Sequence, residues 1–434
     1  MSRLEARPSP GFGGDADLPG DKSISHRALI LSAMADGTSR ITGLLEAEDV
    51  RATRAAVEAF GATIVEDGPD LLVTGGPWRS PGAPIDCGNS GTSARLLMGA
   101  AAGCEGLEAR FVGDESLSRR PMARVTTPLS RMGARFEGGD TLPLTLHGAA
   151  LGGIDYESPV ASAQVKSAIL LAGLRTDAPV RVIEPAPSRD HSEVMLAQFG
   201  VEGAAETVGE GVAVSLGSQR RLTATDVAVP GDPSSAAFLW AAAAMIEGAR
   251  VTTHATLVNA TRTGFLEALE AMGADVQLSN PRVQSGEPVA DVTVAHRRLE
   301  PLHLEAARVP SLIDEVPILA CVAAMADGES VFEGIGDLKH KESDRIGSTA
   351  AGLVANGVSV FPDADRLTIL GRGRVAGGGE VICHHDHRIA MAFLTLGLAA
   401  RAAIRIDDAG PIATSFPSFV AIMRSLGADI GEPQ

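Results

Sequence analysis

Residues 22–37 read KSISHRALILSAMADG, and this stretch decides the fold because its pattern returns five more times along the chain. From Ala28 to Ala35 nearly every residue is apolar or small, so a helix here has no polar face to turn toward water. We therefore expect a helix that is buried on most of its surface. Its polar start is typical of a helix N-terminus, where side chains satisfy free backbone N–H groups.

Five later stretches share this buried-helix pattern. Each has Ser, Thr or Asp at its first or second position and continues as an apolar run. Their sequences are GTSARLLMGAAAGC, SAQVKSAILLAGL, PSSAAFLWAAAAMIEG, IDEVPILACVAAMADG and DHRIAMAFLTLGLAA.

A second series of helices alternates with the first, and each of its members ends in a glycine followed by a strand-like segment. Glycine suits this position because a left-handed residue at a helix C-terminus costs least without a side chain. The segments are AFGATI, RMGARF, QFGVEG, AMGADV, ANGVSV and SLGADI, with their glycines at Gly61, Gly133, Gly200, Gly273, Gly357 and Gly427.

Short β-rich pieces lie between the two kinds of helix, so the repeat consists of strand, buried helix, strand, surface helix and strands. Six repeats divide as three plus three near DVAVPGDPSS, residues 226–235. We expect an α/β fold with two similar domains joined by a hinge. The alternative is a solenoid of six tandem repeats, although solenoid repeats are usually shorter and more regular.

Composition narrows the class of protein. The chain has 434 residues and a net charge of −17, which argues against wholesale binding to nucleic acid or to an anionic membrane. No run approaches the ~18 apolar residues of a membrane span, and the N-terminus lacks a signal-peptide core. The unpaired spacing of Cys87, Cys104, Cys321 and Cys383 indicates free thiols, so we expect a cytoplasmic protein.

Basic residues gather at the starts of the buried helices and in the loops that lead to the surface helices. If the buried helices of a domain run parallel, their N-termini emerge on one face and favour an anion. Several converging arginines indicate a carboxylate or phosphate ligand. The carboxylates of Asp314 and Glu342 add the capacity for proton transfer. The basic residues are Lys22, Arg27, Arg120, Arg345 and Arg388.

Each motif also has a purely structural interpretation. Asp21 and Ser23 are typical helix caps, and KESDR at residues 341–345 is typical of a solvated helix start. CHHDHR at residues 383–388 contains metal-ligating side chains, but adjacent ligands rarely reach one ion, so we expect no metal site.

Two further motifs carry weak signals. GNSGTS at residues 88–93 is a glycine-rich turn into a helix but lacks the lysine of a P-loop. Ser23 as the nucleophile of a triad would need a positioned histidine, and His26 falls on the same helix.

Eight motifs resemble those of one family in the same order, the 5-enolpyruvylshikimate-3-phosphate (EPSP) synthases. The resemblance runs from about Pro19 to Pro417. The motifs are PGDKSISHRALILSAMA, DCGNSGTSARLL, GDESLSRRPM, SAQVKSAILLAGL, PGDPSSAAFLWAAA, IDEVPILA, KESDR and DHRIAMAF.

The resemblance implies two domains, each of three βαβαββ units, in the inside-out α/β barrel of enolpyruvyl transferases. It places the first domain at residues 18–228, the second at 229–434 plus an N-terminal strand in 1–17, and the active site in the cleft between them. The implied reaction transfers the enolpyruvyl group of phosphoenolpyruvate to the 5-hydroxyl of shikimate 3-phosphate and releases phosphate, on the pathway to chorismate and the aromatic amino acids. No cofactor is implied, and we expect a monomer whose partners are its substrates.

The same resemblance implies roles for individual residues. It assigns catalysis to Lys22, Asp314, Glu342 and His387. It assigns shikimate 3-phosphate binding to Lys22, Ser23, Arg27, Ser162, Ala163, Gln164, Arg189, Asp314 and Lys341. It assigns phosphoenolpyruvate binding to Lys22, Asn89, Gly91, Arg120, Gln164, Arg345 and Arg388.

The chain departs from some members of the family at two places. Thr414 stands where some relatives carry a phosphoenolpyruvate-binding lysine, and SRDH at 188–191 differs from relatives with a tyrosine in that loop. Gly91 occupies a position linked to the glyphosate response, and we expect glyphosate to compete with phosphoenolpyruvate.

Two other functions stay open at this point. The related transferase that acts on UDP-N-acetylglucosamine usually carries a reactive cysteine in the loop that corresponds to residues 113–121, which has none here. A catalytically dead binding protein of the same fold is the other alternative, and it should have lost one of Lys22, Arg120, Asp314 or Glu342.

Overall fold

The computed structural model describes residues 3–433 and divides into two compact units. We call Gly20–Val229 with Val283–Glu287 the first unit, and Met1–Pro19, Pro230–Arg282 and Pro288–Gln434 the second unit. The boundaries predicted from the sequence are 17/18 and 228/229. The prediction also assigns residues 283–287 to the other half, so this segment is the main difference between the two divisions.

Residues 3–433 form six four-stranded sheets, three in each unit. The first unit contains the sheets β14 (Val227–Ala228), β3 (Thr38–Thr42), β5 (Asp70–Thr74), β4 (Thr63–Asp67); β6 (Ile85–Asp86), β7 (Glu108–Val112), β9 (Leu144–His147), β8 (Arg135–Gly138); and β10 (Ile154–Glu157), β11 (Val180–Glu184), β13 (Gly211–Leu216), β12 (Gly203–Val208).

The second unit contains three sheets of the same design. They are β16 (Asp275–Gln284), β17 (Glu287–Ala295), β15 (Arg250–Leu257), β2 (Gly13–Ala16); β18 (His303–Leu304), β19 (Asp327–Glu333), β21 (Arg366–Arg372), β20 (Ser359–Pro362); and β22 (Glu380–Val381), β23 (Ile404–Ile406), β1 (Leu4–Arg7), β24 (Asp429–Gly431).

One sheet illustrates the repeat. β6 pairs parallel with β7, and β7 and β8 each pair antiparallel with β9. A parallel pair needs a helical crossover, whereas β8 and β9 are joined by a short loop. The order strand, helix, strand, helix, strand, strand follows, so the predicted α/β fold with βαβαββ repeats is confirmed.

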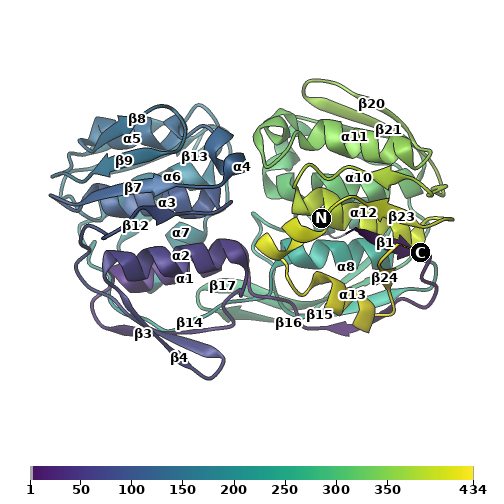
Figure 1. Ribbon diagram of the computed structural model, residues 1–434, viewed down its shortest axis with the longest axis horizontal. Helices are drawn as coiled ribbons and strands as arrows, with labels where there is room; N and C mark the ends of the chain where they lie inside the picture. The colour runs from purple at the N-terminus through teal and green to yellow at the C-terminus, as the bar shows by residue number, and fades with distance from the viewer. Residues whose placement is uncertain (1–2, 434) are drawn as a thin grey trace. The chain divides into compact units, whose positions relative to one another are not determined.

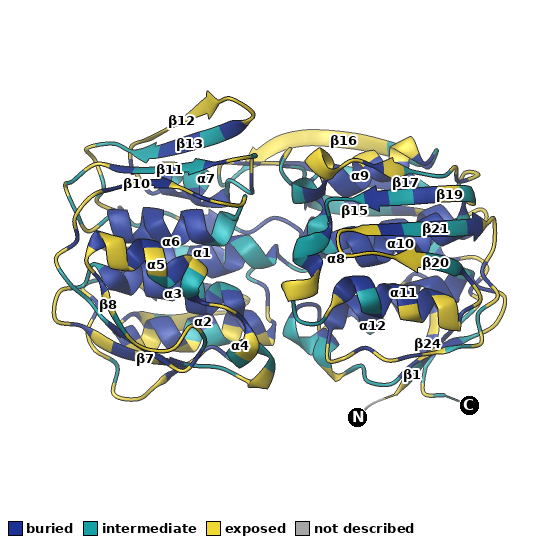
Figure 2. Ribbon diagram, turned by 90° about the horizontal axis from the view of Figure 1, so that it is seen from above, coloured by how far each residue is buried: buried dark blue, intermediate teal, exposed yellow. Residues whose placement is uncertain are grey.

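The predicted buried helices are confirmed, three in each unit of the described chain. Each helix lies inside its unit, as the dark ribbons of Figure 2 show, although first-turn residues such as Lys22 and Gln164 are partly exposed. They are α1 (Lys22–Met34), α3 (Gly91–Ala102), α6 (Ala163–Gly173), α8 (Pro233–Met245), α10 (Val316–Met325) and α12 (His387–Ala399).

The outer helices end at the predicted glycines. All six of these glycines have φ between 85° and 120°, which is the left-handed backbone that glycine adopts without strain. The outer helices are α2 (Glu48–Phe60), α5 (Ala123–Met132), α7 (His191–Gln198), α9 (Gly264–Ala271), α11 (Arg345–Ala355) and α13 (Phe419–Ser425). Shorter helical segments are α4 (Glu115–Arg119), η1 (Ala306–Ser311), η2 (Ile313–Glu315), η3 (Gly336–His340) and η4 (Gly410–Thr414).

Two sheets are completed by strands that are distant in the sequence. β14 pairs parallel with β3 at Val227 and Ile41, and β2 pairs parallel with β15 at Gly13 and Arg250. β1 lies between β23 and β24. The repeats are therefore closed by chain segments that follow or precede them by many residues, which the local pattern of the sequence does not show.

The turn between β16 and β17 belongs by its contacts to the first unit. Ser285 Oγ accepts a hydrogen bond from Ala228 N at 2.8 Å, and Gln284 Nε2 donates to Ala228 O at 3.2 Å. His191 Nδ1 lies 2.7 Å from Glu287 Oε1. These contacts to β14 and α7 are the physical reason that residues 283–287 do not group with the rest of their hairpin.

Between residues 3 and 433, no helix combines the length and the apolar character needed to cross a membrane.

Candidate active site

The N-termini of α1, α3 and α6 meet in the first unit, where α3 and α6 run side by side (Figure 1). Arg27 of α1 donates to Ser167 of α6, and Gln164 of α6 contacts Thr92 of α3. These hydrogen bonds join residues within the first two turns of each helix, so the three helices begin close together. The expected gathering of helix N-termini is thus present within this unit.

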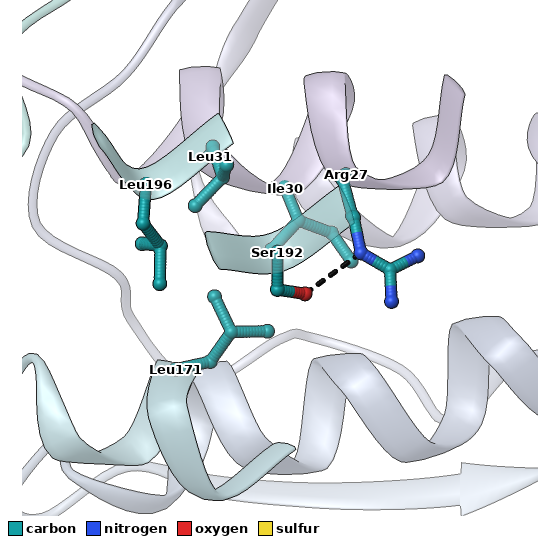
Figure 3. A pocket seen from close by; sticks show the side chains of 6 residues that line it. All are labelled: Arg27, Ile30, Leu31, Leu171, Ser192 and Leu196. Atoms are coloured by element: carbon teal, nitrogen blue, oxygen red, sulfur yellow. Dashed lines mark hydrogen bonds between the residues drawn. The ribbon is translucent and has the colours of Figure 1, made fainter. Parts of the chain in front are cut away.

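Arg27 is buried, and its hydrogen bonds go to neutral oxygen atoms. Nε donates to Ser192 Oγ at 2.8 Å (Figure 3), Nη2 to Ser167 Oγ at 2.7 Å and Nη1 to Ser23 O at 3.0 Å. Removal from water lowers the pKa of Arg27 to about 10, with Glu193 acting in the opposite direction. The guanidinium remains charged at neutral pH and attracts an anion.

Lys22 begins α1, directly after its cap. Asp21 Oδ1 accepts from Ile24 N at 2.8 Å, so the capping interpretation of Asp21 is confirmed. Lys22 Nζ lies 3.1 Å from Asp49 Oδ2, and its side chain is 21% exposed. The ammonium is therefore held in place but is still within reach of solvent.

Asn89, Gly91 and Arg120 form the next group, at the start of α3. Arg120 Nη2 donates to Asn89 Oδ1 at 2.7 Å, and Asn89 Nδ2 donates to Asp114 Oδ2 at 2.7 Å. A Cβ atom on Gly91 would lie 2.7 Å from Arg95 Nη1 and 3.4 Å from Arg120 Nη1. A larger residue here would have to displace the end of the Arg95 side chain, because two guanidinium groups lie close to this position.

Arg95 is a residue of this group that the sequence reasoning missed. Its Nη1 donates to Gln164 Oε1 at 2.7 Å, and Gln164 Nε2 donates to Thr92 Oγ1 at 3.0 Å. A signal was present, since Arg95 follows Gly91 by four residues and so lies on the same face of α3.

Ser162, Ala163 and Arg189 complete the first-unit set. Ser162 N donates to Glu184 Oε1 at 2.7 Å, Ala163 opens α6, and both residues are partly exposed. Arg189 lies in the loop before α7, and its charge contributes to lowering the pKa of Arg27. We call these residues, together with Lys22, Ser23, Arg27, Asn89, Gly91, Arg120 and Gln164, the first-unit cluster.

A different arrangement surrounds Arg345 in the second unit. Its Nη2 lies 2.5 Å from Glu342 Oε2, its Nε 2.8 Å from Asp386 Oδ2 and its Nη1 3.4 Å from Asp314 Oδ1. Burial opposes the charged form, but Asp386 and Glu342 outweigh it, so the pKa of Arg345 lies above its ordinary value. This guanidinium holds three carboxylates together.

Arg388 joins α12 to the start of α10. Its Nη1 donates to Asp314 O at 3.0 Å and lies 3.3 Å from Glu315 Oε1, which accepts from Ser234 Oγ at 2.5 Å. Asp386 Oδ1 caps α12 by accepting from Arg388 N at 2.9 Å. The N-termini of α8, α10 and α12 therefore also meet, within the second unit.

His387 and Lys341 lie beside these groups. His387 Nδ1 is 3.4 Å from Thr414 Oγ1, and Lys341 Nζ is 3.8 Å from Asp314 Oδ1 and 3.5 Å from Asp337 Oδ2. We call Asp314, Lys341, Glu342, Arg345, His387 and Arg388 the second-unit cluster.

The CHHDHR motif does not assemble a metal site in residues 3–433, where no three His, Cys, Asp or Glu side chains come close enough to share an ion. Cys383 is buried, whereas His384 and His385 are exposed. Both histidines have a left-handed backbone, with φ of 51° and 58°. Asp386 instead caps a helix and binds Arg345.

The two clusters differ in what they can do chemically. The first-unit cluster presents cations and amide or hydroxyl donors, which suit anionic ligands. The second-unit cluster adds carboxylates beside two arginines, which suits proton transfer next to an anion.

Comparison with known proteins decides the family. The family model described as EPSP synthase (3-phosphoshikimate 1-carboxyvinyltransferase) matches residues 9–423. This chain belongs to the EPSP synthase family.

Relatives in the EPSP synthase family match over the whole length. The chain is 49% identical to the 3-phosphoshikimate 1-carboxyvinyltransferase of Caulobacter vibrioides, with 100% of this chain and 99% of that protein covered. It is 50% identical to the enzyme of that name from Phenylobacterium zucineum, with 99% and 96% covered.

Solved structures agree with the EPSP synthase fold. The chain matches EPSP synthase from Acinetobacter baumannii with a TM-score of 0.86 and 40% identity, covering 99% of this chain and 100% of that one. The enolpyruvyl transferase NikO from Streptomyces tendae matches with a TM-score of 0.80 at 19% identity, a likeness that shows the fold alone.

Proposed function

We propose that this protein transfers the enolpyruvyl group of phosphoenolpyruvate to the 5-hydroxyl of shikimate 3-phosphate, with release of phosphate. The observation that carries this proposal is the EPSP synthase family match over residues 9–423, joined to relatives of that name at 49–50% identity over nearly their full length. The same support favours this reaction over transfer to UDP-N-acetylglucosamine. The step belongs to aromatic amino acid biosynthesis.

Shikimate 3-phosphate would be bound mainly by the first-unit cluster. Arg27 supports this role, because a buried cation among neutral acceptors keeps a net positive charge toward a phosphate. We assign this substrate to Lys22, Ser23, Arg27, Ser162, Ala163, Gln164 and Arg189, with Asp314 and Lys341 from the second unit.

Phosphoenolpyruvate would use residues from both clusters: Lys22, Asn89, Gly91, Arg120, Gln164, Arg345 and Arg388. The close approach of Gly91 to Arg120 and Arg95 supports an anion held against that backbone. At Arg345 the contact with Asp314 is the longest of its three carboxylate contacts, and we propose that a substrate oxygen takes its place. Both clusters would then act on one pair of bound substrates, with the two units as the two domains.

The carboxylates and Lys22 would move the protons. As the 5-hydroxyl oxygen bonds to C2 of phosphoenolpyruvate, Asp314 takes the hydroxyl proton and Glu342 gives a proton to the methylene carbon. The resulting ketal phosphate then loses phosphate as Glu342 takes back a proton from the methyl group. Lys22 neutralises the departing phosphate, and His387 supports the proton transfers from beside Thr414.

We also propose that the protein works as a monomer in the cytoplasm, without cofactor, metal, nucleic acid or membrane, and that glyphosate competes with phosphoenolpyruvate. Four free cysteines within the described range are in keeping with a reducing compartment.

The decisive experiment is release of phosphate from phosphoenolpyruvate by the purified protein. Release should require shikimate 3-phosphate. Release without an acceptor, or with UDP-N-acetylglucosamine in its place, would refute the assignment, and no release with either acceptor would favour a catalytically dead protein. Light scattering with and without the substrates measures the molar mass in solution, which should be that of one chain.

A further inference from the structure

Three consecutive residues at the start of α7 contact other elements of the first unit. His191 meets Glu287 at the end of the β16–β17 turn, and Ser192 meets Arg27 and Ser167. Glu193 Oε1 lies 2.8 Å from Lys166 Nζ of α6. Contacts to several elements therefore set the position of this turn of helix, and the reaction proposed above gives none of these three residues a role.

Lys166 lies at the centre of these contacts. Its side chain is 2% exposed, and Nζ is 2.8 Å from both Glu184 Oε2 and Glu193 Oε1. Burial opposes its charge, yet the two carboxylates outweigh burial and raise the pKa of Lys166. The ammonium is held between strand β11 and helix α7, with no part in the surface of the protein.

The order of residues along α6 and α7 relates this ion cluster to Arg27. Lys166 is followed by Ser167, and Glu193 is preceded by Ser192, so the ion pair and the serine pair are neighbours. Ser167 Oγ and Ser192 Oγ lie 2.6 Å apart, and both accept from the guanidinium of Arg27. The Lys166–Glu193 pair thereby fixes the spacing of two acceptors on which Arg27 depends.

The pocket beside Arg27 offers little replacement for these acceptors. Figure 3 shows the Nε–Ser192 hydrogen bond at its edge, next to aliphatic side chains. Among the described residues that line it, Ser192 is the one with a side-chain acceptor for Arg27. The lining residues are Arg27, Ile30, Leu31, Leu171, Ser192 and Leu196. If α7 shifts, the guanidinium loses an acceptor and faces an apolar wall.

Glu184 extends the same cluster to the start of α6. It accepts from Ser162 N at 2.7 Å and from Ser188 Oγ at 2.7 and 2.8 Å. Ser162 and the loop that carries Arg189 are thus tied to the carboxylate that Lys166 neutralises.

We propose that Lys166 is a positioning residue for shikimate 3-phosphate. By bridging Glu184 and Glu193 it fixes Ser167 and Ser192, and through them the guanidinium of Arg27. It does not touch the substrate. The inference rests on the proposed function, since shikimate 3-phosphate is the ligand that Arg27 would bind.

The first test uses Glu193, because Lys166 keeps Glu184 when Glu193 is changed and the fold should survive. Calorimetry measures the binding of shikimate 3-phosphate. Steady-state kinetics at saturating shikimate 3-phosphate measure the KM of phosphoenolpyruvate. Glu193→Ala should weaken shikimate 3-phosphate binding about tenfold, whereas Glu193→Gln, which keeps an acceptor, should stay within about threefold. The KM of phosphoenolpyruvate should stay within about threefold in both, which a general loosening of the fold would not give.

The second test changes Lys166 itself. Lys166→Met should weaken shikimate 3-phosphate binding about 10- to 100-fold, since charged hydrogen bonds are lost, and Lys166→Arg should recover much of this loss. Arg405→Met is the control, because it takes one of two cations from the buried Glu5, 2.6 Å away in the second unit, where Arg7 remains at 2.9 Å. Its thermal stability should fall while shikimate 3-phosphate affinity is unchanged.

The outcomes separate the two proposals. If the wild-type protein binds shikimate 3-phosphate and a folded Glu193→Ala protein binds it equally well, the positioning role of Lys166 is overturned and the proposed function stands. A wild-type protein that does not bind shikimate 3-phosphate overturns both the inference and the proposed function.

Discussion

Arg27 and Arg345 are two buried guanidinium groups, one in each unit, and their surroundings differ in charge. Arg27 donates to two hydroxyls and a carbonyl, and its pKa is lowered to about 10 because burial dominates. Arg345 contacts Asp314, Glu342 and Asp386, and its pKa is raised because the carboxylates outweigh burial.

This difference in surroundings indicates a different role for each guanidinium group. A buried charge that no carboxylate directly contacts is costly unless a ligand pairs with it, so Arg27 is suited to attract an anion. The charge of Arg345 is already compensated, so its main effect is to hold carboxylates where they can exchange protons. Arg27 is thus expected to govern affinity for shikimate 3-phosphate, and the carboxylates held by Arg345 the chemical step.

The largest expected effect comes from the carboxylates of the second-unit cluster. Glu342→Gln and Asp314→Asn should lower kcat about 10²–10⁴-fold, because each removes a proton-transfer group. Shikimate 3-phosphate affinity should change less than about threefold for Glu342→Gln, since this residue is not assigned to that substrate. Steady-state kinetics and calorimetry measure the two quantities, and a loss of affinity as large as the loss in kcat would break the comparison.

The next effect is on stability. Arg345→Met leaves three carboxylates around an apolar side chain, so the free energy of unfolding should fall by about 3–5 kcal/mol. Arg27→Met leaves neutral hydroxyl and carbonyl groups, so its loss should be about 1–3 kcal/mol. Urea unfolding of both variants tests this ranking, and equal losses would mean that the neutral and charged surroundings do not differ energetically.

Arg27 sharpens the comparison in binding. Arg27→Met should weaken shikimate 3-phosphate binding about 10- to 100-fold, because one charge-assisted contact to the phosphate is lost. The difference in affinity between the wild-type protein and Arg27→Met should become smaller as ionic strength rises, because salt screens the attraction between the protein and the phosphate. Calorimetry at two salt concentrations gives the result, and wild-type affinity in the variant would remove Arg27 from the site.

The smallest effect is expected at Gly91. A Cβ atom there lies 2.7 Å from the end of the Arg95 side chain, which is flexible enough to move. Gly91→Ala should therefore raise the KM of phosphoenolpyruvate by up to about tenfold and weaken glyphosate inhibition, with shikimate 3-phosphate binding little changed. Competition kinetics provide the measurement, and an unchanged KM with unchanged inhibition would show that Arg95 and Arg120 do not contact this ligand.

Much of the candidate site was predictable because its residues stand at helix starts. Asp21, Ser90, Asp232 and Asp386 cap four of the six inner helices with their side chains. Local sequence marks such positions, since an N-cap residue and the apolar run after it are neighbours. The residues missed, Asp49 and Arg95, act through contacts to Lys22 and Gln164 that are 27 and 69 residues away.

The sequence by itself determined the repeat. The apolar runs specify six inner helices, and a glycine ends each outer helix, because burial and backbone freedom are local properties of composition and residue type. The tertiary structure alone decided that Lys166 is a buried ion between Glu184 and Glu193, that residues 283–287 join the first unit, and that β14 completes the sheet of β3. Charge compensation and strand pairing depend on which distant segments meet, and no local pattern specifies that.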